Sequence, residues 1–355
     1  MDNTSRDAIS FQEILESLPK DIMIIDSFQK AHSVLCSGKY KKIACAISGG
    51  SDSDVLLDII TKIDTEHIVD YFFFDTGMEY QATKEHLTFL EKKYGITIQK
   101  VRARTPVPLA VRKAGYPFLN KKTSEYIHRL QIHNFQWEDD TFENLIKKYP
   151  HCDSALRWWT NSKSESGSSQ HNINQNKWLK EFLIANPPTF HISQSCCGHA
   201  KKHNLDKMGY ELVITGMRKA EGGARAGLTQ CFFPKKKEAD PDKYNPIFWY
   251  KKAEKEAYEE YAEICHSRCY TEYGLQRTGC AGCPFGRHFE YELEVLKQYE
   301  PKLYKAACNI FAEPYEYTRK YRQFCKEQEE KLRLKKKDME KNQIGYQYTI
   351  FDITG

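Results

Sequence analysis

Long apolar segments are absent from this sequence of 355 residues. No apolar run approaches the roughly 18 residues that a membrane-spanning helix requires, which argues against a helical membrane protein. The first twenty residues mix charges and lack the apolar stretch of a secretory signal. We therefore expect a soluble, cytoplasmic protein.

A strong excess of one charge is also missing. Lysine and arginine number 53 against 48 aspartates and glutamates, which gives a net charge of +5. This surplus suits an anionic ligand but does not require nucleic acid. Hydrophobic residues at 40% and charged residues at 28% exclude wholesale disorder. The length allows one large core with appendages or two domains.

Cysteine, by contrast, is abundant, with 12 residues. Structural disulfides are rare in a reducing compartment, so metal binding, redox chemistry or simple burial must account for these thiols. Their spacing has to decide between these uses.

Short apolar runs alternate with helical patterns, which predicts βαβ units and an α/β fold with a mostly parallel twisted sheet and helices on both faces. Helical spacing of apolar residues over 10–36 adds one or two leading helices. The expected strands are 43–47, 67–74, 97–101 and 211–215, and the expected helices between them are 55–63 and 81–94.

This pattern predicts a helical N-terminal segment at 1–39, a nucleotide-binding domain at 40–290 with a helical insertion at 116–191, and a helical C-terminal region at 291–355. The polar interval 162–175 predicts a mobile loop within the insertion. The basic run 331–337 is typical of a solvated helix face, with phosphate binding as the alternative.

A serine-glycine turn follows the first predicted strand and opens a helix. It comprises Ser48, Gly49, Gly50, Ser51, Asp52 and Ser53. Backbone N–H groups and the helix dipole converge on an anion at such a position, and glycine lets the main chain come close to it. A Walker phosphate loop is disfavoured because no Gly-Lys-Ser/Thr follows. An ordinary turn capped by serine is the alternative.

Ser-Gly-Gly-x-Asp-Ser after a first strand resembles the PP-loop of ATP pyrophosphatases and phosphoadenosine-phosphosulfate (PAPS) reductases. The resemblance extends to Asp75, Thr76 and Gly77 at the end of the second strand, and to Thr215-Gly216-Met217-Arg218 with Arg225. It implies an adenine nucleotide alpha hydrolase-like fold that binds ATP or an adenylyl sulfate. The loops and Gly216 would then hold the nucleotide, with magnesium on its phosphates, while Asp52, Arg218 and Arg225 serve catalysis.

Four cysteines are candidate metal ligands: the adjacent pair Cys196-Cys197 and, about eighty residues later, Cys280 and Cys283. Adjacent side chains diverge, which suits different iron atoms of a cluster better than one small tetrahedral zinc ion. The arrangement resembles the iron–sulfur adenylylsulfate (APS) reductase branch, which implies a [4Fe–4S] cluster with Lys201 close to it. Zinc and unligated buried thiols remain the alternatives.

The chain departs from that branch near its C-terminus. Sulfonucleotide reductases attack the sulfate with a cysteine close to that end, whereas residues 345–355 contain none. Cys308 or Cys325 would have to substitute. The other cysteines are expected to be buried or partly exposed thiols: Cys36, Cys45, Cys152, Cys231, Cys265 and Cys269.

Three functions fit these observations. The first is adenylyl activation of an acceptor with release of pyrophosphate, coupled to sulfur transfer from a sulfur donor. The second is APS or PAPS reduction with a thioredoxin-like reductant. The third is a non-catalytic nucleotide- or nucleic-acid-associated iron–sulfur module, for which Trp137, Trp158, Trp159 and the basic run would provide contacts.

Overall fold

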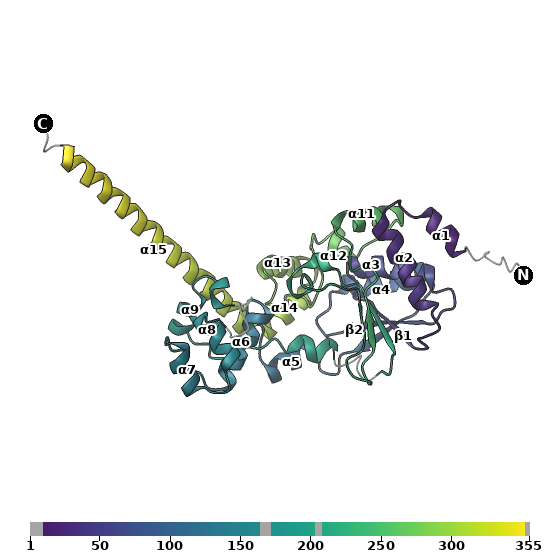
Figure 1. Cartoon of the computed structure of the whole chain (residues 1–355), viewed down its shortest axis with the longest axis horizontal. Helices are drawn as coiled ribbons and strands as arrows, with labels where there is room; N and C mark the ends of the chain where they lie inside the picture. Colours follow the sequence, from purple (N-terminus) through teal and green to yellow (C-terminus); the bar gives the residue numbers. More distant parts are fainter. Residues whose placement is uncertain (1–9, 164–171, 203–207, 352–355) are drawn as a thin grey trace, which may run out of the picture. The chain divides into compact units, whose positions relative to one another are not determined.

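The computed structural model describes residues 10–163, 172–202 and 208–351. The chain divides into two compact units (Figure 1). The α/β unit comprises 1–110, 197–282 and 290–306, and the helical unit comprises 111–196, 283–289 and 307–355.

A six-stranded sheet is the centre of the α/β unit, with the strand order β3-β2-β1-β4-β6-β5. All neighbouring strands are parallel except β5, which runs antiparallel to β6. The strands are β1 (Ile43–Ala46), β2 (Val69–Asp75), β3 (Ile98–Arg102), β4 (Leu212–Thr215), β5 (Phe232–Phe233) and β6 (Asp242–Tyr244). The predicted parallel α/β sheet is confirmed, while the short β5 and β6 escaped prediction because two or three residues carry no periodicity.

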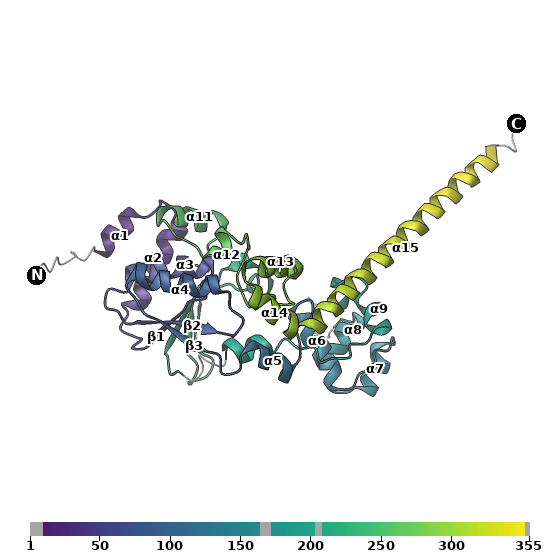
Figure 2. The same ribbon diagram turned by 180° about the vertical axis from the view of Figure 1, so that it is seen from behind.

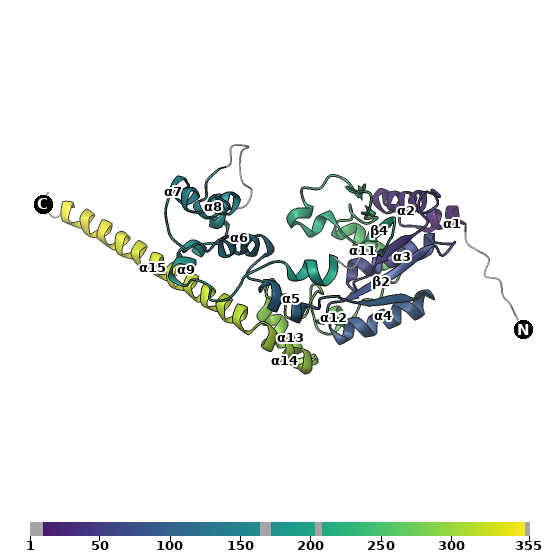
Figure 3. The same cartoon turned by 90° about the horizontal axis from the view of Figure 1, so that it is seen from below.

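Helices connect these strands in the order expected for βαβ units (Figures 1 and 3). Those of the α/β unit are α1 (Phe11–Ser17), α2 (Ile22–Leu35), α3 (Ser51–Ile63), α4 (Gln81–Tyr94), α11 (Lys252–Tyr261), α12 (Arg268–Thr271) and most of α13 (Phe289–Tyr299). The side chains of Ser10 and Asp21 cap the first two helices by accepting backbone N–H bonds. Helices α5 (Val107–Ala114) and α14 (Pro301–Ile310) include residues of both units.

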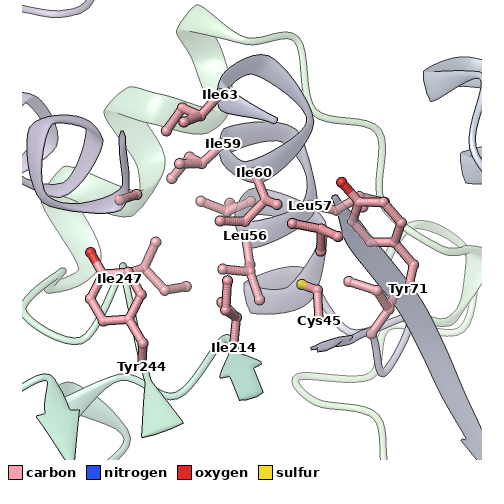
Figure 4. Packing of buried hydrophobic residues seen from close by; sticks show 14 of the residues in the cluster. Cys45, Leu56, Leu57, Ile59, Ile60, Ile63, Tyr71, Ile214, Tyr244 and Ile247 are labelled. Carbon is pink, nitrogen blue, oxygen red and sulfur yellow. The ribbon is translucent and has the colours of Figure 1, made fainter. Parts of the chain in front are cut away.

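The main hydrophobic core lies between one face of the sheet and helix α3 (Figure 4). Leu56 and Ile60 of α3 are fully buried in the same cluster as Cys45 of β1 and Ile214 of β4. Each such aliphatic side chain stabilises the fold by roughly 1.5–3 kcal/mol. This packing fixes α3 against β1 and thereby fixes the serine-glycine turn between them. The opposite face holds a smaller cluster around Ala44, Phe72 and Val213.

The helical unit has its own aromatic core. Trp158 and Trp159 of α8 are buried in it, together with Phe182 and Tyr321. The helices are α6 (Lys121–Ile132), α7 (Phe142–Lys148), α8 (Asp153–Thr160), α9 (Leu179–Ala185) and α15 (Ala312–Phe351). These two tryptophans are core residues and do not present stacking surfaces for nucleic-acid bases.

Helix α15 extends well beyond α6–α9 within this unit (Figures 1 and 2). The basic run 331–337 lies on this extension, and its side chains are exposed, as expected of a solvated helix. Of the predicted mobile interval 162–175, residues 164–171 lie outside the described residues. In the described ranges, no helix combines the length and apolar character needed to cross a bilayer.

Candidate functional site

A cavity of about 760 Å³ opens in the α/β unit beside the carboxyl ends of β1 and β4. In the sheet, β2 lies on one side of β1 and β4 lies on the other. The carboxyl ends of β1 and β4 therefore mark the topological switch point, where open α/β sheets bind ligands. The wall includes the residues Ala46, Ile47, Ser48, Gly50, Ser51, Asp52, Ser53, Phe73, Phe74, Glu79, Thr215, Gly216, Met217, Arg218, Glu221, Arg225, Tyr270, Gln276, Arg277, Thr278 and Gly279. The serine-glycine turn and the β4 loop, both predicted from the sequence, meet here.

Hydroxyl groups of the serine-glycine turn stabilise its conformation through hydrogen bonds to its own backbone. Gly49 has a φ of +68°, a conformation that favours glycine, and an added Cβ there would lie 2.7 Å from Cγ2 of Thr83. The backbone N–H of Gly50 donates to Oγ of Ser53 at 3.1 Å and to Oγ of Ser48 at 3.3 Å. Helix α3 begins at Ser51, so its first N–H groups face the cavity region, where they favour an anion.

Gly216 brings the β4 loop against the start of α3. A Cβ at this position would lie 3.0 Å from the carbonyl oxygen of Asp52 and 3.2 Å from its carbonyl carbon. Glycine is therefore required for the close approach of these two loops. Gly216, predicted from the family resemblance, has a structural reason to be there.

Arg218 forms an ion pair with Asp52 at the cavity wall. Its Nε lies 2.9 Å from Oδ1 of Asp52, although the N–H does not point at that oxygen as in a hydrogen bond. A second cation, Nζ of Lys255, lies 3.9 Å from the same Oδ1. Nη1 of Arg218 also donates to the carbonyl oxygen of Tyr250 at 3.3 Å. Asp52 is thus neutralised by two cations and orients the guanidinium group of Arg218.

Arg225 also lines the cavity, but its side chain is 43% exposed. Nη1 of Arg225 pairs with Oε1 of Glu221 at 2.7 Å. The backbone N–H of Arg218 donates to the other oxygen of Glu221 at 3.1 Å. The structure therefore brings both predicted arginines together, with Arg225 in the more solvated position.

A chain of alternating charges continues from Lys255 into the core. Lys255 pairs closely with Glu259, and Oε1 of Glu259 lies 2.8 Å from Nε2 of His266. Nδ1 of His266 lies 2.9 Å from Oδ2 of the buried Asp54, whose Oδ1 lies 3.0 Å from Nε2 of His86. This chain links the serine-glycine turn to helices α4 and α11.

Burial opposes protonation of His266, but its hydrogen bonds to Asp54 and Glu259 outweigh that effect and raise its pKa to about 9. Burial likewise opposes ionisation of Glu259, yet hydrogen bonds from His266 and Lys255 lower the pKa of this carboxyl. At neutral pH the His266 side chain is therefore an imidazolium held between two carboxylates.

At the end of β2 the cavity wall includes Phe73, Phe74 and Glu79, whereas the predicted Asp75, Thr76 and Gly77 do not line this cavity. Oδ1 of Asp75 accepts the N–H of Gly77 at 2.8 Å, which shapes the turn. The hydroxyl of buried Thr76 donates to Oε1 of Glu79 at 2.6 Å. The nucleotide-binding role of these three residues stays a prediction.

The Cys280 segment adjoins this turn. Sγ of Cys280 lies 3.4 Å from Oγ1 of Thr76, and the N–H of Ala281 donates to the carbonyl oxygen of Met78 at 2.7 Å. Gly279, the preceding residue, lines the cavity. One of the four candidate metal ligands is therefore adjacent to the loop after β2 and to the cavity wall.

The other three candidate ligands are placed as follows. Cys196 is buried in the helical turn that leads into η2 (Gly198–Lys202), while the adjacent Cys197 and the loop residue Cys283 are half-buried. The side chain of Lys201 lies outside the described residues. Across the described ranges, no group of three or more Cys, His, Asp or Glu side chains is gathered as a metal site. The donor chemistry of four thiols suits iron, but the four-cysteine cluster stays a prediction.

Sequence reasoning missed much of the cavity wall, namely Glu79, Tyr270, Gln276, Arg277 and Thr278, and the supporting residues Lys255 and His266. Residues 276–279 directly precede Cys280, and that proximity was the available signal. Tyr270, Lys255 and His266 offered none, because only tertiary packing brings them to the turn.

Of the eight remaining cysteines, three are buried, three are half-buried, and two, Cys36 and Cys265, are exposed, which the sequence did not predict. Cys45, Cys152 and Cys269 are buried, and burial raises the pKa of each thiol. Cys325, a candidate substitute nucleophile, contacts the carbonyl oxygen of Lys177 at 3.5 Å, and burial raises its pKa. A thiol with a raised pKa is a poor nucleophile at neutral pH.

Comparison with known proteins places this cavity in context. The phosphoadenosine phosphosulfate reductase domain matches residues 42–285, which include every cavity-lining residue. The chain is 27% identical over 179 residues to the uncharacterized protein MJ0066 of Methanocaldococcus jannaschii, a match covering 48% of this chain and 34% of that protein. The chain therefore spans about a third of the length of this curated relative.

Solved structures show distant likeness. A PAPS reductase from Candida auris in a phosphate complex is 16% identical with a TM-score of 0.38, covering 77% of this chain and 96% of that one. The U34-tRNA thiolase NcsA from Methanococcus maripaludis with its [4Fe–4S] cluster is 14% identical with a TM-score of 0.36, covering 86% and 80%. Such scores carry no functional argument. The domain match across most of the chain does establish kinship: this chain belongs to the phosphoadenosine phosphosulfate reductase domain family.

Proposed function

We propose that this chain is a PP-loop enzyme that binds ATP, or a related adenylyl nucleotide, in the cavity between the β1 and β4 loops. The observation that carries the proposal is the serine-glycine turn at the start of α3, which faces the cavity with Arg218 held beside it. Backbone N–H groups and a guanidinium group at one wall form a site for phosphate oxygens.

Each part of the wall has a role in this proposal. The turn residues 48–53 hold the phosphates, and Arg218 leaves Asp52 to donate to a phosphate oxygen while Lys255 keeps Asp52 neutralised. The carboxylate of Glu79 also faces the cavity and would repel a bare polyphosphate. A magnesium ion on the phosphates would offset that repulsion. The half-buried Phe74 offers an apolar surface for the base.

The proposed reaction is adenylyl transfer. An acceptor nucleophile attacks the α-phosphorus of ATP, the bond from that phosphorus to the bridging oxygen breaks, and pyrophosphate leaves. A sulfur donor then displaces AMP from the activated acceptor, which gives a carbon–sulfur bond. Catalysis of this kind consists mainly of positioning and charge stabilisation, which suits a site without an obvious nucleophile.

The proposal includes a [4Fe–4S] cluster on Cys196, Cys197, Cys280 and Cys283. Its support is the spacing of these residues and the proximity of Cys280 to Thr76. When bound, the cluster would supply an iron site for sulfur. The chain's own residues bind and orient the nucleotide.

Nucleotide binding and pyrophosphate release test this function. Calorimetry with ATP, APS and PAPS on anaerobically purified protein should show tightest binding of one of the three. Pyrophosphate should then form with candidate acceptors and fall sharply in Arg218→Ala. If no nucleotide binds and no ATP is consumed under any condition, the proposal is wrong.

Sulfonucleotide reduction is the second candidate, favoured by the family's name. It requires a thiolate that attacks the sulfate sulfur to form an S-sulfo cysteine and release the nucleotide, after which an external thiol reductant releases sulfite. Sulfite production from APS or PAPS with thioredoxin would support it. Its persistence after replacement of both Cys308 and Cys325 would exclude those nucleophiles.

A further inference from the structure

The first N–H of the phosphate-facing helix already has an oxygen partner. The backbone N–H of Ser51 donates to the hydroxyl of Tyr270 at 3.2 Å. That hydroxyl lies 3.1 Å from Oγ1 of Thr278. Both residues line the cavity, and both come from the segment that precedes Cys280, far in sequence from the turn. A protein hydroxyl therefore lies where an anion at this helix start would bind.

Three hydroxyl groups converge at this point. A Cβ added to Gly50 would lie 3.1 Å from Oγ1 of Thr278, 3.2 Å from the hydroxyl of Tyr270 and 3.3 Å from Oγ of Ser48. Hydroxyls can turn their protons toward an incoming acceptor without moving the oxygen. The start of α3 and the three hydroxyls around Gly50 thus gather hydrogen-bond donors that suit a tetrahedral oxyanion.

We infer that Tyr270, assisted by Thr278, is a phosphate-binding residue of the nucleotide site. This inference rests on the proposed function and adds a ligand to it. In this structure the Tyr270 hydroxyl accepts the N–H of Ser51. When a nucleotide binds, a phosphate oxygen accepts the hydrogen bond from the N–H of Ser51. The Tyr270 hydroxyl then donates a hydrogen bond to the phosphate.

The surroundings of Tyr270 suit a donor. Burial raises the pKa of its hydroxyl, although hydrogen bonds from Thr278 and Ser51 act in the opposite direction, so the proton stays in place at neutral pH. The ring centroid of His266, an imidazolium at that pH, lies 5.8 Å from that of Tyr270. A neutral hydroxyl near a positive group favours an anion in front of it.

The opposite role predicts the opposite sign. Suppose instead that the hydroxyl only accepts the N–H of Ser51 in the protein without nucleotide. Its removal would then leave that N–H without an acceptor, and nucleotide affinity would rise. As a ligand, its removal costs the nucleotide a hydrogen bond to a charged oxygen. The direction of the affinity change therefore distinguishes the two roles.

The test uses the full-length chain and its Tyr270→Phe variant, with ATP, AMP and adenosine as probes in calorimetry or competition binding. We expect a loss of about tenfold to a hundredfold for ATP, the range for a hydrogen bond to a charged group, and no change for adenosine. AMP shows whether the α-phosphate is the contact. Thr278→Val, nearly the same shape, should give a smaller loss with the same dependence on phosphate.

Tyr273→Phe is the matched control. Tyr273 lies in the same segment and its hydroxyl bonds to Glu300 at 3.4 Å, but it is not part of the cavity wall. We expect unchanged binding in this variant. Thermal unfolding of all variants verifies that they are folded.

Each remaining outcome contradicts the inference. Equal or tighter ATP binding by both Tyr270→Phe and Thr278→Val would show that these hydroxyls only stabilise the turn and do not bind phosphate. Equal losses for ATP and adenosine would show a general effect on the fold. Failure of the wild-type chain to bind any adenine nucleotide would overturn the proposed function itself, and this inference with it.

Discussion

Nδ1 of His266 lies 2.9 Å from Oδ2 of the buried Asp54, two residues after Asp52 of the serine-glycine turn. The other ring nitrogen lies 2.8 Å from Glu259, so the ring is enclosed by two carboxylates from α3 and α11. The start of α3 is thus held by charge as well as by apolar packing.

This geometry predicts a pH-dependent stability. The pKa of His266 is raised from about 6.5 in the unfolded chain to about 9, so its contribution is fully present below about pH 6.5 and is lost as pH rises through about 9. The contribution is on the order of 2–3 kcal/mol. The range from about pH 6 to about pH 10 spans both pKa values. Denaturant unfolding across this range should show the unfolding free energy of the wild-type chain falling relative to that of His266→Gln.

The matched control replaces the exposed His151 with glutamine, which should follow the wild-type pH profile. A constant stability difference between wild type and His266→Gln across the range would contradict the assignment of an imidazolium.

The second prediction separates the two arginines of the cavity. Arg218 is 15% exposed and oriented by Asp52, whereas Arg225 is 43% exposed and paired with Glu221. A desolvated guanidinium group binds a phosphate more strongly than a solvated one. Arg218→Ala should therefore weaken ATP binding by about tenfold or more, and Arg225→Ala by no more than a few-fold. Arg218→Lys should recover only part of the loss; equal effects of the two alanine variants in calorimetry would refute this ranking.

The sequence predicted the parts of the site that lie in local motifs. Residues 48–53 sit between a strand and a helix, where glycine and serine either face an anion or cap an ordinary turn. Gly216 and Arg218 likewise lie in a local motif after β4. The parallel sheet followed from apolar runs alternating with helical patterns.

Contacts between distant segments could not be predicted in this way. Lys255 and His266 belong to polar stretches that resemble any solvated helix or loop, and only their packing against Asp52 and Asp54 reveals a role. Tyr270 reaches Ser51 across more than two hundred residues of sequence. The sequence left open whether Trp158 and Trp159 contact nucleic acid or belong to a core, and their burial shows that they belong to a core.

The third prediction concerns iron. Anaerobically purified protein should contain iron and acid-labile sulfide in equal amounts and show the broad visible absorption of an iron–sulfur cluster. Replacement of Cys280 or Cys283 by alanine should abolish both, while Cys265→Ala, which removes an exposed thiol nearby in sequence, should not. Stoichiometric zinc without sulfide would contradict the cluster in favour of a zinc site.

The fourth prediction tests the charge chain behind the turn. Lys255→Met removes the cation between Asp52 and Glu259, whose side chains are only 22% and 17% exposed. Asp52 then keeps only Arg218 and Glu259 keeps only His266, so the unfolding free energy should fall by about 1–3 kcal/mol. The double variant Lys255→Met/Glu259→Gln also removes one of the two carboxylates that Lys255 contacts. Denaturant unfolding should therefore show that at least part of the lost unfolding free energy is restored. A double variant less stable than Lys255→Met would show that the lysine does not act through Glu259.

The last prediction isolates loop geometry from fold stability. A methyl group at Gly216 would meet the carbonyl oxygen of Asp52 at 3.0 Å, and that carbonyl belongs to the first turn of α3, which the core holds in place. The β4 loop must therefore shift, carrying Arg218 away from the phosphate-facing turn. Gly216→Ala should weaken ATP binding by about tenfold or more while lowering unfolding free energy by only about 1 kcal/mol. Gly227→Ala is the control, because a Cβ there meets open space and its φ is not positive. If Gly216→Ala binds ATP as the wild-type chain does, then the close approach of these loops does not set the position of Arg218.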